Sequence, residues 1–302
     1  LVVPLGALLL FSACEDGDRP AVLSEVETGT WTPPAVNLQP GVLFFDNAPI
    51  TAGGPMTLVW SDEFDSAELD PESWLIQTGD GSNVGLPPGW GNNELQYYQA
   101  DNVELNNGVL VITAREESVG ALNYTSARIT TQDRVALRYG RIEARIRLPG
   151  GQGLWPAFWL LSQDSPYGSW AATGEIDVME ASNLGVGGKN DVFVTLHYGG
   201  EFPDNRFSSE EHDVDGSATA EFHDYAVEWG PSEFRWYVDG ELKRTADSWF
   251  SSAASYPAPF DQAFHILLNV AVGGNVPGSP DATTVFPVTM EVDYVRVFSG
   301  AP

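Results

Sequence analysis

The sequence predicts an all-β fold, an antiparallel sandwich or jelly roll. Apolar and polar residues alternate with a period of two over much of the stretch from Met56 to Ser299, and no long amphipathic helix is apparent there. The chain of 302 residues also contains 31 Gly and 21 Pro, which favour frequent turns. Many short strands with turns between them are typical of sandwiches and jelly rolls rather than of helical bundles.

Turn residues and alternation place the strands in the first half of the body. Asn106-Asn107-Gly108 lies between two short apolar stretches, 103–105 and 109–113. It predicts a hairpin, because Asn and Gly tolerate a positive φ. In 141–148 the apolar residues fall on one face of a strand and the charged residues on the other.

The second half of the body continues the pattern. Residues 225–229 and 234–238 predict a pair of neighbouring strands. Residues 264–272 form an apolar run that only Asn269 interrupts, which predicts a strand buried on both faces. Residues 291–298 alternate again and close the body.

The N-terminal region is predicted to contain a targeting signal followed by a linker. Residues 1–13 are uncharged and almost wholly apolar, shorter than the roughly 20 residues that span a bilayer, so 1–14 predicts a signal peptide. Residues 15–55 are rich in Pro, Gly and acids and predict a linker, with a short apolar run at 42–45 that allows one docked strand. The folded body then covers 56–299.

Cys14 is the only cysteine of the chain and follows the apolar run directly. Phe11-Ser12-Ala13-Cys14 resembles a bacterial lipoprotein box, so we expect lipidation at Cys14; the alternative is an incidental small residue near a cleavage site. The expected location is the bacterial cell envelope, as a periplasmic or cell-surface lipoprotein, or outside the cell after secretion. We expect contact with a membrane only through this anchor.

The charge restricts the partners. Forty-two acidic and 14 basic residues give a net charge of −28, which repels nucleic acids and anionic lipids. Neutral ligands remain open, and a strongly anionic polysaccharide is disfavoured. We expect a monomer that binds no nucleic acid.

The candidate catalytic acids lie in residues 174–180, whose sequence is Gly-Glu-Ile-Asp-Val-Met-Glu. In a strand Glu175 and Asp177 share a face, whereas strict alternation would turn Glu180 into the core at a large cost. A β-bulge at Val178-Met179 absorbs one residue and returns Glu180 to the carboxylate side.

Three carboxylates on one face suit glycoside hydrolysis. Retaining glycosidases need two carboxyl groups roughly 5–5.5 Å apart, one as nucleophile and one as acid/base. Crowded acids also push their pKa values apart. The alternatives are a solvated acidic face and, less favoured because the strand supplies no His, a metal site.

Neighbouring segments favour a sugar-binding site. Trp155 and Trp159 share a face around a small Ala157 and form a flat-sided slot suited to sugar rings, although core positions are common for Trp. His197 is predicted to lie on the carboxylate side. Asn269 needs a hydrogen-bond partner in its apolar strand, which a hydroxyl-rich ligand would supply.

These residues resemble glycoside hydrolase family 16, and in particular its bacterial laminarinases (endo-β-1,3-glucanases). The resemblance covers about four-fifths of the chain, from about Val59 to Phe298. The segments that carry it are Glu175-Ile-Asp-Val-Met-Glu180, Trp155-Pro-Ala-Phe-Trp159, Trp60-Ser-Asp-Glu-Phe64, Trp90-Gly-Asn-Asn-Glu-Leu-Gln-Tyr97, Thr125-Ser-Ala-Arg-Ile129, Tyr139-Gly-Arg-Ile-Glu-Ala-Arg145, Leu196-His-Tyr198 and Asn269-Val-Ala-Val-Gly-Gly274.

The resemblance implies a curved β-jelly roll of the concanavalin A-like type, with a concave substrate cleft in a catalytic domain at 56–299. It implies a retaining endo-hydrolase of neutral β-1,3-glucan that needs no cofactor for its chemistry. Glu175 is implied as nucleophile, Glu180 as general acid/base and Asp177 as assisting carboxylate. The implied cleft residues are Asn93, Arg128, Trp155, Trp159, Trp170 and His197, and a structural Ca²⁺ is implied at Glu63, Asp293 and the carbonyl of Gly108.

Two alternative functions remain open at this point. One is another glycan hydrolase of the family, a mixed-linkage glucanase, agarase or carrageenase; the mixed-linkage enzymes have the shorter Glu-x-Asp-x-Glu, against which the extra residue here argues. The other is a non-catalytic glucan-binding protein. Such relatives lose one or both catalytic glutamates, and both are present here.

Overall fold

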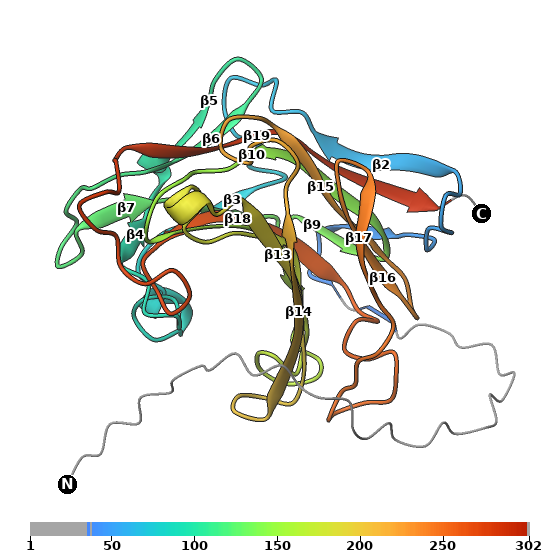
Figure 1. The fold of residues 1–302 in the computed structure, drawn as a ribbon. Coiled ribbons are helices and arrows are strands. Elements are labelled where there is room, and N and C mark those ends of the chain that lie inside the picture. Colours follow the sequence, from blue (N-terminus) through green and yellow to red (C-terminus); the bar gives the residue numbers. More distant parts are fainter. Residues whose placement is uncertain (1–34, 37, 301–302) are drawn as a thin grey trace, which may run out of the picture. The chain divides into compact units, whose positions relative to one another are not determined.

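The computed structural model describes residues 35–36 and 38–300, and the regular elements among these residues are almost all strands (Figure 1). The larger sheet has nine strands and is called the first sheet. Its spatial order is β1 (Leu43–Asp46), β9 (Val135–Arg138), β18 (Phe264–Val272), β11 (Leu154–Ser162), β12 (Glu175–Glu180), β13 (Asp191–Gly199) and β14 (Asn205–Asp213), with β8 (Arg128–Thr130) paired to β18 and β3 (Leu75–Gln77) paired to β8.

The second sheet has eight strands. Its order is β17 (Glu241–Ala246), β16 (Phe234–Val238), β15 (His223–Trp229), β10 (Gly140–Arg147), β19 (Val288–Gly300), β6 (Leu110–Ala114) and β5 (Val103–Leu105), with β2 (Met56–Asp62) paired to β19. The remaining elements are the parallel pair β4 (Gln96–Tyr98) and β7 (Tyr124–Ser126) and the short 3₁₀ turns η1 (Ser82–Val84), η2 (Ala100–Asn102) and η3 (Val186–Gly188).

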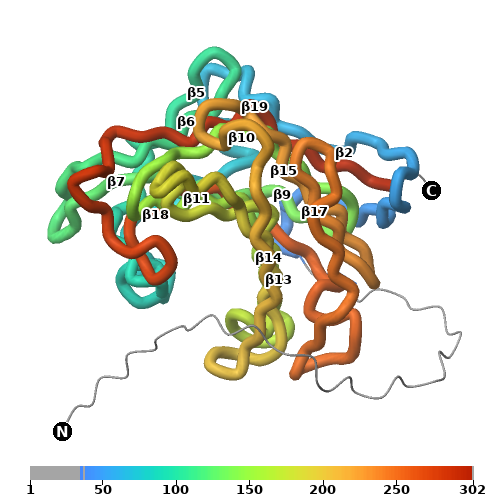
Figure 2. The backbone as a smooth tube through the Cα atoms, viewed as in Figure 1, coloured from blue at the N-terminus to red at the C-terminus, as the bar shows by residue number. Residues whose placement is uncertain are grey.

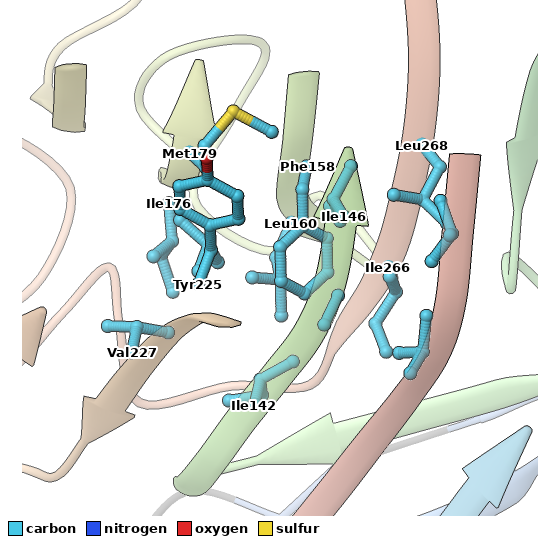
Figure 3. Close-up of a cluster of buried hydrophobic side chains, with 14 of the residues drawn as sticks. Ile142, Ile146, Phe158, Leu160, Ile176, Met179, Tyr225, Val227, Ile266 and Leu268 are labelled. Carbon is cyan, nitrogen blue, oxygen red and sulfur yellow. The ribbon is translucent and has the colours of Figure 1, made fainter. Parts of the chain in front are cut away.

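The core lies between the two sheets. Figure 3 shows Ile142 and Val227 of the second sheet in one cluster with Leu160, Ile176 and Ile266 of the first. All of these side chains are buried. The predicted sandwich is therefore confirmed, and Figure 1 shows that its first sheet is curved, with β14 turned down from β18.

The expected strands form where the periodicity placed them. The four apolar side chains of 141–148 are all buried, and every residue of β18 is buried. Asn107 and Gly108 adopt positive φ angles of 54° and 78° in the hairpin that joins β5 to β6. The predicted pair at 225–229 and 234–238 is the antiparallel pair of β15 and β16.

The body begins earlier than Met56. β1 pairs in parallel with β9, and Arg235 donates a hydrogen bond to the carbonyl of Ile50. The second half of the predicted linker 15–55 is therefore part of the body, with the docked strand at 43–46. The predicted signal peptide and Cys14 lie outside the described residues. Within those described, the structure has no apolar helix of membrane-spanning length.

The predicted β-bulge is present in β12. On the β13 side, Asp177 pairs with Thr195 and Glu180 with Phe193, so Val178 and Met179 together face the one residue between. Both bulge side chains are buried. The extra residue thus restores Glu180 to the face that carries Glu175 and Asp177.

We predict that deleting Met179 destabilises the protein, because strict alternation then turns Glu180 into the core. Burying a carboxylate without a partner costs several kcal/mol. Met179→Leu keeps the bulge and nearly the same volume, so it should cost less than about 1.5 kcal/mol. Urea unfolding measures both, and a deletion variant as stable as Met179→Leu would contradict the role of the bulge.

Candidate active site

Three acids of β12 define a face of the first sheet that is turned away from the second sheet, here called the carboxylate face. Ile176, Val178 and Met179 belong to the core cluster between the sheets, which leaves the acids on the other side. Strand pairing arranges their neighbours in rows across the sheet. The rows are His265–Leu161–Glu175–His197–Phe207, Leu267–Trp159–Asp177–Thr195–Ser209 and Asn269–Ala157–Glu180–Phe193–Glu211.

Glu175 and Asp177 form a close group with His197. One ligand atom from each of the three residues lies within 4.8 Å of the others. His197 Nε2 is 3.4 Å from Asp177 Oδ2 and 3.7 Å from Glu175 Oε1. Trp170 Nε1 donates a 2.8 Å hydrogen bond to Glu175 Oε2, which stabilises negative charge on that oxygen.

Burial favours the protonated form of the other two acids. Desolvation, followed by the charges of Asp177 and Glu175, raises the pKa of Glu180 well above its usual value, against the opposing effects of His197 and Trp155. The pKa of Asp177 is raised well above its usual value by burial first and by Glu175 second. Glu180 can therefore carry a proton at a pH where an exposed glutamate has lost it.

The two tryptophans of β11 lie on the carboxylate face as predicted. Both are half-buried, whereas Phe158 and Leu160 between and beside them are fully buried in the core. Trp155 Nε1 donates a 2.8 Å hydrogen bond to Glu180 Oε1. The indole thus fixes the position of the carboxyl group and leaves a flat ring beside it.

Arg128 lies next to this slot. Its guanidinium carbon is 4.6 Å from the ring centroid of Trp90 and 4.7 Å from that of Trp159, a cation–π sandwich. The residue is buried, and its Nε has no hydrogen-bond partner. Asn93 is exposed at the rim, where its amide donates a 2.8 Å hydrogen bond to Asn275.

Asn269 finds hydrogen-bond partners within the protein, so its side chain needs no ligand to be satisfied, and a direct contact with substrate stays a prediction. Its Oδ1 accepts a 2.7 Å hydrogen bond from Trp159 Nε1, and its amide nitrogen donates to the hydroxyl of Tyr98 at 3.3 Å. Asn269 therefore positions the Trp159 ring.

The hydrogen-bond chain continues to Glu94, which sequence reasoning did not identify as a site residue. This buried carboxylate accepts hydrogen bonds from Gln96 at 2.6 Å, Asn92 at 3.1 Å and Tyr98 at 3.2 Å. Burial raises the pKa of Glu94, while these donors and Arg128 oppose the shift. Position 94 follows a Gly-Asn-Asn loop, where nothing in the pattern signals that the acid is buried.

The group can hydrolyse a glycosidic bond. Glu175 presents a hydrogen-bonded carboxylate, Glu180 is an acid whose pKa is raised, and the two share a face with indole rings that suit the apolar faces of sugars. A solvated acidic face, one of the two alternatives, does not describe these side chains, because Asp177 is 1% exposed and Glu180 is hydrogen-bonded to Trp155.

The family comparison agrees with this geometry. The model of the family described as "Glycosyl hydrolases family 16" matches residues 91–296, which include all the acids above. The chain belongs to glycosyl hydrolase family 16.

Relatives within family 16 include β-glucan hydrolases. A "Glucan endo-1,3-beta-glucosidase A1" of Niallia circulans is 42% identical over 268 residues, which are 83% of this chain but 38% of the relative. A "Beta-glucanase" of Rhodothermus marinus is 41% identical over 257 residues, 80% of this chain and 84% of the relative. The laminarinase catalytic domain of Thermotoga maritima MSB8 superimposes with a TM-score of 0.73 at 38% identity, over 82% of this chain and 99% of that one.

The expected calcium ligands are engaged in ion pairs. Glu63 binds Arg296 through both oxygens at 2.9 and 2.7 Å, and Asp293 lies 3.6 Å from Arg145. The two acids already face guanidinium groups, and nothing in the structure tests the ion implied at them and at the carbonyl of Gly108, which stays a prediction.

We predict that Glu180→Gln stabilises the folded protein at neutral and alkaline pH. Because the folded pKa of Glu180 is raised above its ordinary 4.5, wild-type stability falls as the pH rises from about that value through the folded pKa. The amide has no such penalty and can still accept the hydrogen bond from Trp155. The gain should therefore be small at pH 4 and larger at pH 8.

Thermal unfolding at both pH values measures this gain. Glu116 is exposed, so Glu116→Gln serves as the control and should show no comparable increase with pH. A Glu180→Gln gain that does not increase between pH 4 and pH 8 would contradict the desolvation of Glu180.

Proposed function

We propose that the protein is an endo-acting, retaining hydrolase of β-1,3-glucan. The observation that supports it most is the bulged strand β12, which presents Glu175 and Glu180 on one face beside the ring of Trp155. The relatives named above act, by their names, on β-glucans, one of them on the 1,3 linkage. A chain with a net charge of −28 is also suited to a neutral polymer rather than to a sulfated one.

The reaction follows two displacements. In the first, protonated Glu180 gives its proton to the glycosidic oxygen while a carboxylate oxygen of Glu175 attacks the anomeric carbon. The bond to the leaving sugar breaks, and a covalent glycosyl-enzyme ester forms. In the second, Glu180, now a carboxylate, takes a proton from water; the water oxygen attacks the same carbon and releases Glu175.

The neighbours support this division of roles. Trp170 holds Glu175 by a hydrogen bond, and Asp177 and His197 lie close to Glu175, with one ligand atom of each of the three within 4.8 Å of the others. The raised pKa of Glu180 suits the proton donor of the first step. After the proton has left, the Trp155 indole still donates to Glu180 and stabilises its charge.

Sugar binding rests on rings and on a few polar groups. Trp155 and Trp159 offer flat surfaces, and Arg128 and Asn93 offer donors beside them. Asn269 contributes through Trp159 rather than by a free amide. This set of rings and donors suits the hydroxyl-rich, uncharged surface of a glucan.

The test measures the rate at which reducing ends are released from laminarin, lichenan, agarose and carrageenan. We expect laminarin to be cleaved fastest, with β-anomers as the first products in proton NMR, because two displacements retain the configuration. Glu175→Gln should lower the rate by roughly 1,000-fold or more, since an amide cannot form the ester. Asp177→Asn should lower it less.

Each competing function predicts a different result. Initial α-anomers, or a Glu175→Gln variant with near-native turnover, would overturn the retaining mechanism. Faster cleavage of lichenan, agarose or carrageenan would assign another family 16 substrate. Binding of laminarin without hydrolysis would make the protein a non-catalytic glucan-binding protein. Glu116→Gln, at an exposed acid, is the control for purification and folding.

Attachment through Cys14 is a separate part of the proposal. It rests on the lipoprotein-box resemblance of residues 11–14 and on the Pro- and Gly-rich segment that follows. Expression of wild type and Cys14→Ser in a bacterial host, followed by cell fractionation, tests it. We expect wild type in the membrane fraction and Cys14→Ser in the soluble one; recovery of both in the same soluble fraction would exclude the anchor.

A further inference from the structure

Phe207 of β14 is an exposed aromatic residue to which the proposed mechanism gives no role. Its side chain is 58% exposed although it lies in a regular strand. β14 is the edge strand of the first sheet, and Figure 2 shows the chain running along β13 and β14 as one arm of the molecule. An exposed phenyl ring beside an active site offers a flat apolar surface to a ligand.

The strand register places Phe207 on the carboxylate face. Glu175 pairs with His197, and His197 pairs with Phe207. A 2.8 Å hydrogen bond between the hydroxyls of Thr195 and Ser209 joins the same face of the two strands one row further along. The intervening Ser208 faces the other way and is bonded to Arg244 of the second sheet.

The rings between Phe207 and the nucleophile form a continuous series. The centroid of Trp170 lies 5.4 Å from that of His197, which in turn lies 5.9 Å from that of Phe207. Trp170 also donates its hydrogen bond to Glu175. The series therefore begins at the reacting carboxylate and extends across β13 to the edge of the sheet.

The loops hold this arrangement together. The turn after β13 is tied to the Trp170 loop by two hydrogen bonds, from Ser169 N to Glu201 Oε1 at 2.8 Å and from Phe202 N to the carbonyl of Trp170 at 3.3 Å. These bonds fix Trp170 relative to the turn that leads into β14. Phe207 therefore lies on a strand that the surrounding hydrogen bonds hold in place.

A polysaccharide that crosses the first sheet reaches Phe207. Neighbouring strands lie about 4.8 Å apart, close to the length of one sugar ring, so successive strands can meet successive sugars. The bond is cleaved over β12, and Trp155 and Trp159 lie on the β11 side of it. On the β13 and β14 side, Phe207 provides a ring and the exposed Ser209 provides a hydroxyl, which is hydrogen-bonded to that of the buried Thr195.

We infer that Phe207 is a binding platform for the part of the glucan that extends past β12 toward the β14 edge. This rests on the proposed function, because the occupant is the same neutral chain that Glu175 and Glu180 cleave. With rings on both sides of β12, the bound chain continues in both directions, which is what cleavage within a polymer requires. Phe207 binds substrate and takes no part in bond breaking.

The test compares Phe207→Ala with Phe207→Trp and Phe250→Ala. Phe250 is a matched control, since it is a half-exposed ring that packs against Tyr198 on the opposite face of β13. Each substitution is made in the inactive Glu175→Gln protein, and binding of β-1,3-linked gluco-oligosaccharides of three and of seven sugars is measured by calorimetry. The same substitutions in the active enzyme give KM and kcat on laminarin.

We expect Phe207→Ala to weaken binding of the long oligosaccharide by roughly 2- to 10-fold, the range for loss of one ring contact, and to leave the short one nearly unchanged. KM on laminarin should rise while kcat changes little, and Phe207→Trp should bind like the parent. Equal losses with Phe207→Ala and Phe250→Ala, or no dependence on chain length, would overturn the platform.

The same measurements distinguish a failure of the proposed function from a failure of the inference about Phe207. If wild type does not cleave laminarin, the proposed function fails whatever Phe207 does, whereas cleavage with unchanged binding in Phe207→Ala overturns the inference alone. The exposed edge could also be covered by a second copy of the chain. Gel filtration that shows a dimer which Phe207→Ala dissociates would assign the ring to that contact and reject the platform.

Discussion

The structure of the site depends on one constraint: β12 must keep three acids on one face and three apolar side chains in the core. A strand with a strict period of two cannot do this for Glu-Ile-Asp-Val-Met-Glu. The bulge resolves the conflict by placing Val178 and Met179 opposite one residue of β13, and both remain buried. The neighbouring strands then fix what each acid meets: Trp159 lies beside Asp177, and Ala157 leaves space beside Glu180.

The same arrangement has a cost in stability. Asp177 is almost fully buried and Glu180 is strongly desolvated, so burial raises the pKa of both, and the crowding of like charges adds to the effect. A proton donor for glycoside cleavage needs this shift, which also means that ionising the group works against the fold. Glu94 shows how the protein offsets such a cost elsewhere, with three hydrogen-bond donors around one buried carboxylate.

Local pattern was enough to predict the strands, the bulge and the faces of β11, β12 and β13, because each follows from alternation and from the penalty for burying a charge. It failed where contacts join distant segments. Asn269 bonds Trp159 and Tyr98, and β1 docks beside β9; neither pairing leaves a periodic signal. Phe207 lies in a polar stretch, and only the register from Glu175 through His197 shows which face it occupies.

Ring contacts and hydrogen bonds, rather than charge, account for binding of the polymer at the carboxylate face. The chain is strongly acidic, and the carboxylate face concentrates acids further, so attraction between opposite charges cannot be what holds a neutral polymer there. Arg128 supplies positive charge near Glu94 and Glu175, but it is buried between two indole rings and serves first to balance those acids. Affinity must then come from ring contacts and hydrogen bonds, which depend little on ionic strength. An enzyme of this kind gains binding energy by adding rings along the path of the chain, and Phe207 at the end of the Trp170–His197 series lies where the next ring is needed.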